Sequence, residues 1–230
     1  SWNENTNWSP STVPCGNNVT IDPGSSFEPT LDTKGDCANL TINTGAILTW
    51  SSTDSLKVSG DLDMNGTAAV NHSGSGIFYL SGISKNVTVE ASSNLSSLPL
   101  SIAGSYTFID NMAFDSLGVK NGASVILTAA KTYDLGGNIN NRGTLTMNNA
   151  VLSLEGNFTN TGTFTKGTSE IIFDGALKQL ITGNNNIDFY NVKVNKVSAL
   201  QDSLELQTSI LTDSITISDG MIVSSWNNTL

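Results

Sequence analysis

Hydrophobic and polar residues alternate in many short segments along the chain. Leu, Ile, Val or Met stand at every second position in segments of three or four residues, with polar residues between them. This period of two is typical of strands with one buried and one exposed face. Gly, Asn and Asp separate the segments, and no stretch has the period of an amphipathic helix. The clearest predicted strands are 39–42, 55–58, 86–89, 144–147, 151–154, 191–194, 203–206 and 215–217.

Three stretches of the chain align without gaps. Each begins with Gly, followed by Asp or Asn and an apolar residue, and has a Gly-Thr pair six residues later. They start at Gly60, Gly137 and Gly156, and the last two starts lie 19 residues apart. An antiparallel β-sandwich also has many short strands, but it has no reason to repeat in sequence. We therefore predict an all-β fold, a right-handed parallel β-helix (β-solenoid) of about ten or eleven coils, each of about 19–22 residues.

The opening segment differs from the repeats. Trp2, Trp8, Pro10 and Pro14 precede the first predicted strand at 19–21. We predict that residues 1–38 form an N-terminal cap and the first coil, because a terminal coil must cover an open sheet edge. Residues 39–230 are predicted to be solenoid repeats that continue beyond Leu230 in a longer protein.

Two cysteines stand in this segment, and each precedes a predicted strand. Cys15 lies four residues before Val19, and Cys37 lies three residues before Leu40. In a solenoid they would be neighbours on adjacent coils, so we predict a disulfide worth about 3 kcal/mol. The alternative is two unrelated buried thiols. The disulfide implies an oxidising, extracellular compartment.

Composition and charge narrow the range of partners. Asn, Ser, Thr and Gly make up 104 of the 230 residues, which fits a fold rich in turns. The formal net charge is -10, with nine Lys and Arg142 against 20 acidic residues. Binding to nucleic acid or to an anionic membrane surface therefore has no electrostatic support. No apolar run approaches the roughly 20 residues that a membrane span needs, so we predict no membrane insertion.

Catalytic groups are scattered along the sequence. Asp61 and Asp63 share one face of a predicted strand, but the matching coils carry Asn or Thr at those positions. His72 is the only His, so a zinc site is not expected. We predict no cofactor, no metal and no enzymatic activity. The alternative is a polysaccharide lyase or hydrolase, a class that parallel β-helices often contain.

Two binding functions remain open at this point. Exposed aromatic rings would give an extended glycan stacking platforms, although such rings more often fill the core. Columns of outward Thr are typical of ice-binding solenoids, but here Lys57, Lys193 and Glu205 are expected to interrupt them. The candidate aromatic residues are Trp50, Tyr79, Tyr106, Phe108, Tyr133 and Tyr190.

Most of the chain carries a family resemblance. Residues 2–46, with their early Trp residues and the run Asn39-Leu40-Thr41-Ile42, resemble the start of repetitive cell-surface proteins of gliding bacteria that use type IX secretion. They are similar, more loosely, to the G8 domain. Residues 171–194 resemble a recurring coil of the same surface proteins. The resemblance implies secretion through a C-terminal sorting domain and O-glycosylation at Asp-Ser-apolar motifs. The candidate O-glycosylation sites are Ser55, Ser116, Ser203 and Ser214, although Asp-Ser could equally close a turn before a strand.

Repeats without a catalytic cluster favour a structural role. We expect a non-catalytic extracellular segment of a large secreted cell-surface protein, with a stalk or adhesin role. Its expected partners are other domains of the same longer chain, with surface glycans and secretion or cell-surface proteins as further candidates. The alternative is a carbohydrate-binding or carbohydrate-active β-helix domain that acts on extracellular polysaccharide.

Overall fold

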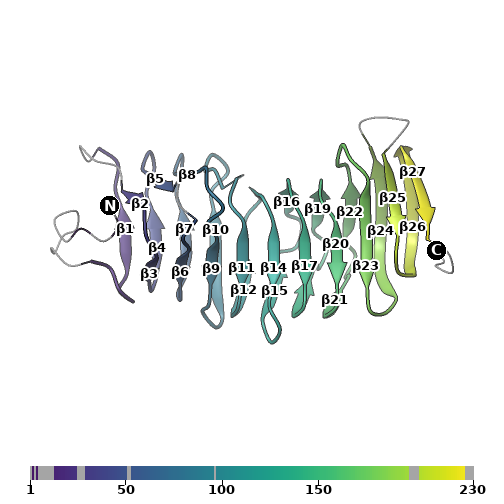
Figure 1. Cartoon of the computed structure of the whole chain (residues 1–230), viewed down its shortest axis with the longest axis horizontal. Coiled ribbons are helices and arrows are strands. Elements are labelled where there is room, and N and C mark those ends of the chain that lie inside the picture. Colours follow the sequence, from purple (N-terminus) through teal and green to yellow (C-terminus); the bar gives the residue numbers. More distant parts are fainter. Residues whose placement is uncertain are drawn as a thin grey trace.

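The computed structural model describes Trp2, Glu4 and residues 13–24, 29–50, 53–95, 97–196 and 202–225. These residues form a rod along which the strands succeed one another in chain order (Figure 1). The strands pair in parallel with their counterparts on neighbouring coils, so the predicted all-β parallel solenoid is confirmed. No described residue is helical, and this part of the chain therefore has no helix that could span a membrane.

Each coil presents up to three faces, which we number in the order in which the chain visits them. The first face is a sheet of eight strands, and the third face is a sheet of ten. The second face consists of a three-stranded and a six-stranded sheet. Isolated bridges at Asn94 and Leu95 lie between these two sheets and connect them into one face.

The strands of the three faces recur in rotation as far as β23, except after β10, where isolated bridges stand in place of a second-face strand. After β23 only the second and third faces alternate. The first face contains β1 (Val19–Ile21), β4 (Leu40–Ile42), β7 (Leu62–Met64), β10 (Lys85–Val89), β12 (Ser105–Phe108), β15 (Ser124–Leu127), β18 (Thr144–Thr146) and β21 (Thr163–Thr165). The second contains β2 (Thr30–Leu31), β5 (Ile47–Trp50), β8 (Ala69–His72), β13 (Met112–Phe114), β16 (Thr132–Leu135), β19 (Val151–Leu154), β22 (Glu170–Phe173), β24 (Ile187–Asn195) and β26 (Ile210–Asp219). The third contains β3 (Gly35–Cys37), β6 (Leu56–Val58), β9 (Phe78–Leu80), β11 (Leu100–Ile102), β14 (Leu117–Val119), β17 (Ile139–Asn141), β20 (Phe158–Asn160), β23 (Gln179–Gly183), β25 (Ser203–Leu206) and β27 (Met221–Ser224).

Coil number and coil length differ from the prediction. Ten strands on the third face correspond to about nine turns over the described residues, fewer than the ten or eleven coils expected. Paired residues are 19 positions apart at Leu145 and Phe164, but 25 apart at Leu62 and Val87. The shortest step is 17 positions, from Leu100 to Leu117. Coils tolerate these differences because extra residues are taken up at the corners while the strands keep their register.

Inward side chains stack into one continuous core. On the first face Val19, Leu40, Leu62 and Val87 occupy successive coils in register, and none is more than 3% exposed. Burying such a side chain contributes about 1.5–3 kcal/mol relative to leaving it in water. Each coil therefore owes much of its stability to the coils directly above and below it.

The glycines of the sequence repeat mark places where the backbones of two coils touch. A Cβ atom at Gly156 would lie 2.3 Å from the carbonyl carbon of Gly137, and one at Gly162 would lie 2.2 Å from the carbonyl oxygen of Gly143. No real Cβ fits at such distances. The repeat of Gly every 19 residues is thus explained by close stacking of corner on corner.

The first coil lies within the predicted cap, and Trp2 is fully buried beside Gly35. Trp8 and Pro10 fall outside the described residues. Strands β1, β2 and β3 of this segment already pair with strands of the next coil.

The two cysteines are one residue out of register. The N–H of Ala38 donates to the carbonyl of Asn17 (2.7 Å), and Val19 pairs with Leu40, so the ladder places Cys37 beside position 16 and not beside Cys15. The chain bends at residues 15–17, where Gly16 has a φ of 66°, before β1 begins. Cys37 is buried and Cys15 is exposed, and both are free thiols. The structure does not contain the predicted Cys15–Cys37 disulfide.

Candidate functional site

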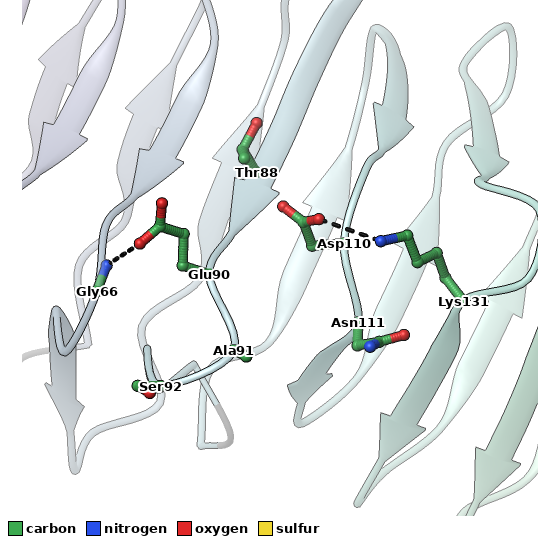
Figure 2. Close-up of a pocket in the computed structure, with 8 residues that line it drawn as sticks. All are labelled: Gly66, Thr88, Glu90, Ala91, Ser92, Asp110, Asn111 and Lys131. Carbon is green, nitrogen blue, oxygen red and sulfur yellow. Dashed lines mark hydrogen bonds and ion pairs between the residues drawn. The ribbon is translucent and has the colours of Figure 1, made fainter.

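A polar groove of about 560 Å³ runs along the edge between the first and second faces. Corner residues of four successive coils line it, from Gly66 through Glu90 and Asp110 to Lys131 (Figure 2). Thr88, Ala91, Ser92 and Asn111 complete the lining.

The groove lies at an unusually short corner. Six other corners between these two faces have four residues, at 43–46, 65–68, 90–93, 128–131, 147–150 and 166–169. Most of them are closed by a hydrogen bond from the fourth N–H to the first carbonyl, as from Ser93 to Glu90 (2.8 Å). The corner between β12 and β13 has only three residues, 109–111. A shorter corner flanked by longer ones gives a recess, and its polar residues form the floor.

The charged groups of the groove already have protein partners. Glu90 accepts a hydrogen bond from the N–H of Gly66 through its carboxylate. Asp110 pairs with the ammonium of Lys131 at 3.4 Å, and about a third of each side chain is exposed. Asn111 accepts from the N–H of Thr132 (2.8 Å). The groove thus offers carboxylate oxygens, amide groups and hydroxyls to a ligand rich in hydroxyl groups.

This donor and acceptor set does not resemble a metal centre. Nowhere in the described ranges do three or more His, Cys, Asp or Glu gather as metal ligands. Of the acidic pair of the sequence, Asp61 and Asp63, the structure gives Asp61 protein partners. The carboxylate of Asp61 accepts from the N–H of Asn86 (2.8 Å) and lies 3.8 Å from the ammonium of Lys85.

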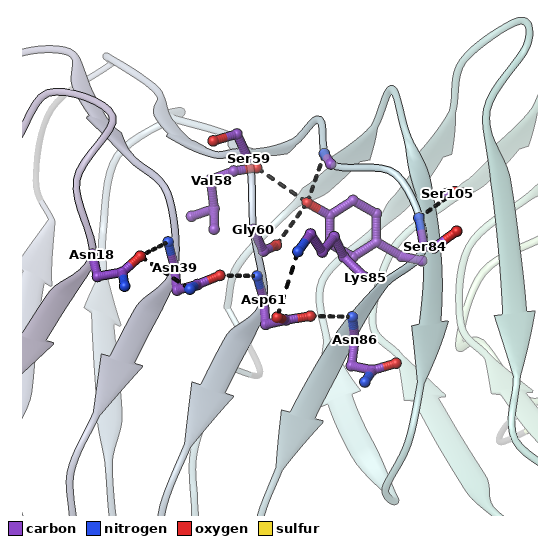
Figure 3. A network of polar contacts seen from close by, with 12 residues as sticks. Asn18, Asn39, Val58, Ser59, Gly60, Asp61, Ser84, Lys85, Asn86 and Ser105 are labelled. Carbon is purple, nitrogen blue, oxygen red and sulfur yellow. Dashed lines mark hydrogen bonds and ion pairs between the residues drawn. The ribbon is translucent and has the colours of Figure 1, made fainter.

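Asp61 belongs to a ladder of side chains that ties coils together. Asn39 donates to the side chain of Asn18 (3.0 Å) and accepts from the N–H of Asp61 (2.8 Å), which in turn binds Asn86 (Figure 3). Similar links join Asp22 to Asn43 at another corner and Asn141 to Asn160 at the ends of β17 and β20. At these positions Asn side chains bond from one coil to the next.

Buried polar side chains fill the inner side of several corners. The hydroxyl of Tyr106 accepts from the N–H of Gly82 (2.8 Å) and lies within hydrogen-bond distance of the carbonyl of Gly60 (3.0 Å). The hydroxyl of Tyr133 donates to the carbonyl of Phe108 (2.8 Å). Burial raises the pKa of Tyr106, and raises that of Tyr133 to about 12. These phenols satisfy backbone groups where the chain turns.

The predicted aromatic platforms are mostly interior. Trp50, Tyr106, Phe108 and Tyr133 are at most 2% exposed, and only Tyr79 and Tyr190 are partly exposed. The first four rings pack in the core, because they occupy inward positions of their strands. Stacking of an extended glycan along these rings is therefore not available.

Three of the four candidate O-glycosylation sites lie where the chain enters the third face, and the fourth lies within a strand of the second face. Ser55, Ser116 and Ser203 are half-buried at the corner that leads into the third face. Ser214 is exposed within β26, and its hydroxyl donates to Asn191 (2.6 Å). The structure brings the first three to one edge of the rod, and modification of all four stays a prediction.

No protein-family model, no curated protein and no solved structure matches the chain. The groove was not found from the sequence, and its only signal there is the short spacing between the strands that end at Phe108 and begin at Met112.

Proposed function

We propose that the chain is a rigid, non-catalytic segment of a large secreted cell-surface protein, in which it acts as a structural stalk. The observation that carries this proposal is the unbroken parallel register of the third face, from β3 to β27. A single sheet that runs the length of the described rod ties each coil to the next by backbone hydrogen bonds.

Side chains reinforce the same connections. The ladder from Asn18 to Asn86 crosses four coils, and Lys166 bonds both Asp188 and Asp213 at 2.8 Å on the two following coils. Polar residues that cluster around a reaction centre in an enzyme are here distributed along the axis. This distribution supports a mechanical role in which the rod holds the parts at its two ends a fixed distance apart.

Small-angle X-ray scattering tests the rod in solution. A stalk gives a scattering curve with a separate cross-sectional region and a maximum dimension well above the width of the rod. A compact, isotropic particle would refute the proposal. Pulling the chain from its two ends in optical tweezers adds the mechanical test, because a stalk should keep its length up to the force at which coils unravel.

The groove favours a second candidate function, carbohydrate binding. Its recessed floor presents Glu90, Asp110 and Asn111 beside Lys131, which is a set of groups that can hydrogen-bond sugar hydroxyls. A glycan array tests this function with Asp110→Ala against Glu155→Ala, an exposed carboxylate at another corner. Loss of a bound glycan only in Asp110→Ala supports binding in the groove. No bound glycan, or equal loss in both variants, removes this candidate.

A further inference from the structure

The charged residues expected to interrupt the outward Thr columns lie on other faces. Lys57 is in β6 and Glu205 is in β25, both on the third face, and Lys193 is in β24 on the second face. The sequence-based objection to an ordered hydroxyl surface therefore does not apply to the first face.

Four consecutive strands of the first face carry a regular outer surface. In β12, β15, β18 and β21 the two outward positions of each strand lie in register, which gives two columns along the rod. We call these eight residues the hydroxyl face. One column is Ser105, Ser124, Thr144 and Thr163, and the other is Thr107, Ile126, Thr146 and Thr165.

The hydroxyl face has no charged member, and all of its side chains are partly or fully exposed. Apart from Ser105, whose oxygen accepts from the N–H of Ser84 (2.7 Å), its hydroxyls make no hydrogen bond to any described residue. Two hydroxyls on the other faces do bond to the protein. Thr182 bonds Gln207 at 3.2 Å, and Thr212 donates to the carbonyl of Tyr190 at 3.0 Å. The free hydroxyls of the hydroxyl face thus lie in register on four successive coils.

The array is fixed in two dimensions. Parallel strands lie about 4.8 Å apart, and alternate residues of one strand lie about 6.6 Å apart. Thr and Ile are β-branched, so their χ1 angles are restricted and their hydroxyl and methyl groups hold set positions. The rows of oxygen and methyl groups therefore repeat with the stiffness of the sheet itself.

We propose that the hydroxyl face binds the surface of ice. The repeat of about 4.8 Å along the rod is close to an oxygen spacing on the prism planes of ice, so water molecules held by the Thr hydroxyls can continue the crystal lattice in that direction. The methyl groups of Thr and Ile126 order the water between the rows. The absence of charge matters, because an ion would hold water in an orientation that ice does not accept. The hydroxyl face also lacks the aromatic rings on which a glycan would stack and the charges with which a protein partner would pair.

The test compares the unmodified chain with two lysine variants. Thr146→Lys places a charge in the middle of the hydroxyl face, and Thr159→Lys makes the same change on the outer surface of the third face. Thermal hysteresis and incorporation into a slowly growing ice hemisphere are measured for each. We expect activity in the unmodified chain and in Thr159→Lys, and a fall to the buffer level in Thr146→Lys.

Circular dichroism melting shows whether each variant is folded, and Thr165→Lys repeats the test at a second position of the face. Absence of ice activity in the unmodified chain would overturn the proposal. Equal loss in folded Thr159→Lys and Thr146→Lys would overturn it as well, because the hydroxyl face would then not be the binding surface.

Discussion

The ammonium group of Lys196 donates a hydrogen bond to Oε1 of Gln179 inside the solenoid, and neither side chain is more than 2% exposed. The same ammonium donates to the carbonyls of Gly175 (3.2 Å) and Leu177 (3.1 Å). The amide nitrogen of Gln179 donates in turn to the carbonyl of Leu154 on the preceding coil (2.7 Å). Two stacked side chains thus connect three successive coils through the interior.

Burial lowers the pKa of Lys196 from 10.5 to about 8, although the charges of Asp202 and Asp174 partly oppose the shift. Between these values the unfolded chain holds a proton that the folded chain has lost, so the free energy of unfolding rises with pH. Below pH 8 both states are protonated and this gain is absent. We expect the contribution of Lys196 to the free energy of unfolding, measured by urea unfolding, to rise from pH 8 toward pH 10.

Two other buried groups lower the free energy of unfolding as the pH rises. Burial raises the pKa of Tyr133 and of Cys37 to about 12, which removes stability once the unfolded forms ionise. The measured quantity is therefore the difference between the unmodified chain and Lys196→Met, since both share these groups. Lys193→Met, three residues earlier in β24, is the control and should keep the rise. An unchanged pH profile in Lys196→Met would contradict the assignment.

The two cysteines should differ sharply in reactivity. Cys15 is exposed, whereas Cys37 is buried and has a pKa of about 12, so almost none of it is thiolate at neutral pH. With a thiol-reactive dye we expect one fast equivalent, abolished by Cys15→Ser, and a second only after unfolding. If no thiol reacts in unfolded protein until a reductant is added, the cysteines form the disulfide instead.

The asparagine ladder should contribute to stability. Asn39→Ala removes a donor to Asn18 and an acceptor for the N–H of Asp61. We expect a loss of about 1 kcal/mol in the free energy of unfolding. Asn140→Ala is the matched control, because Asn140 is exposed and its side chain bonds to no described residue. Its effect should stay within about 0.5 kcal/mol, and equal effects would show that the ladder adds nothing.

Coil stacking makes the repeated glycines intolerant of a methyl group. A Cβ at Gly162 would lie 2.2 Å from the carbonyl oxygen of Gly143, while a Cβ at Gly136 meets no atom within 4 Å. We expect Gly162→Ala to destabilise the chain by about 1–3 kcal/mol and Gly136→Ala to leave its melting temperature nearly unchanged. Similar melting temperatures for both would mean that the coils stack less closely than the structure shows.

Much of the fold was predictable because alternation and Gly spacing report directly on local structure. The strand predicted at 151–154 is β19, and the other predicted strands overlap observed ones. Strand β9 was not predicted, because its outward residue, Tyr79, is aromatic and the segment does not alternate between apolar and polar residues. Local pattern thus identifies a strand only where its outward residues are polar.

The sites were less predictable because they depend on how coils align with one another. A difference of one residue separates Cys15 from the position beside Cys37, and one missing residue at 109–111 opens the groove. Coil lengths vary from 17 to 25 residues, so a fixed period cannot assign Lys57 or Glu205 to a face. Such assignments require strand bounds known to a single residue.

The proposed stalk requires a rod that is rigid along its axis. Double electron–electron resonance, which measures the distance between two spin labels, tests this rigidity most directly. Lys57 and Thr182 occupy the same outward column of the third face, six strand steps apart. With spin labels at these positions in a Cys15→Ser background, the structure predicts a single narrow distance distribution. Its centre should lie at about 29 Å plus the reach of the labels, since each step is about 4.8 Å. A broad distribution, or one centred well below this value, would contradict the rod and the proposed function together.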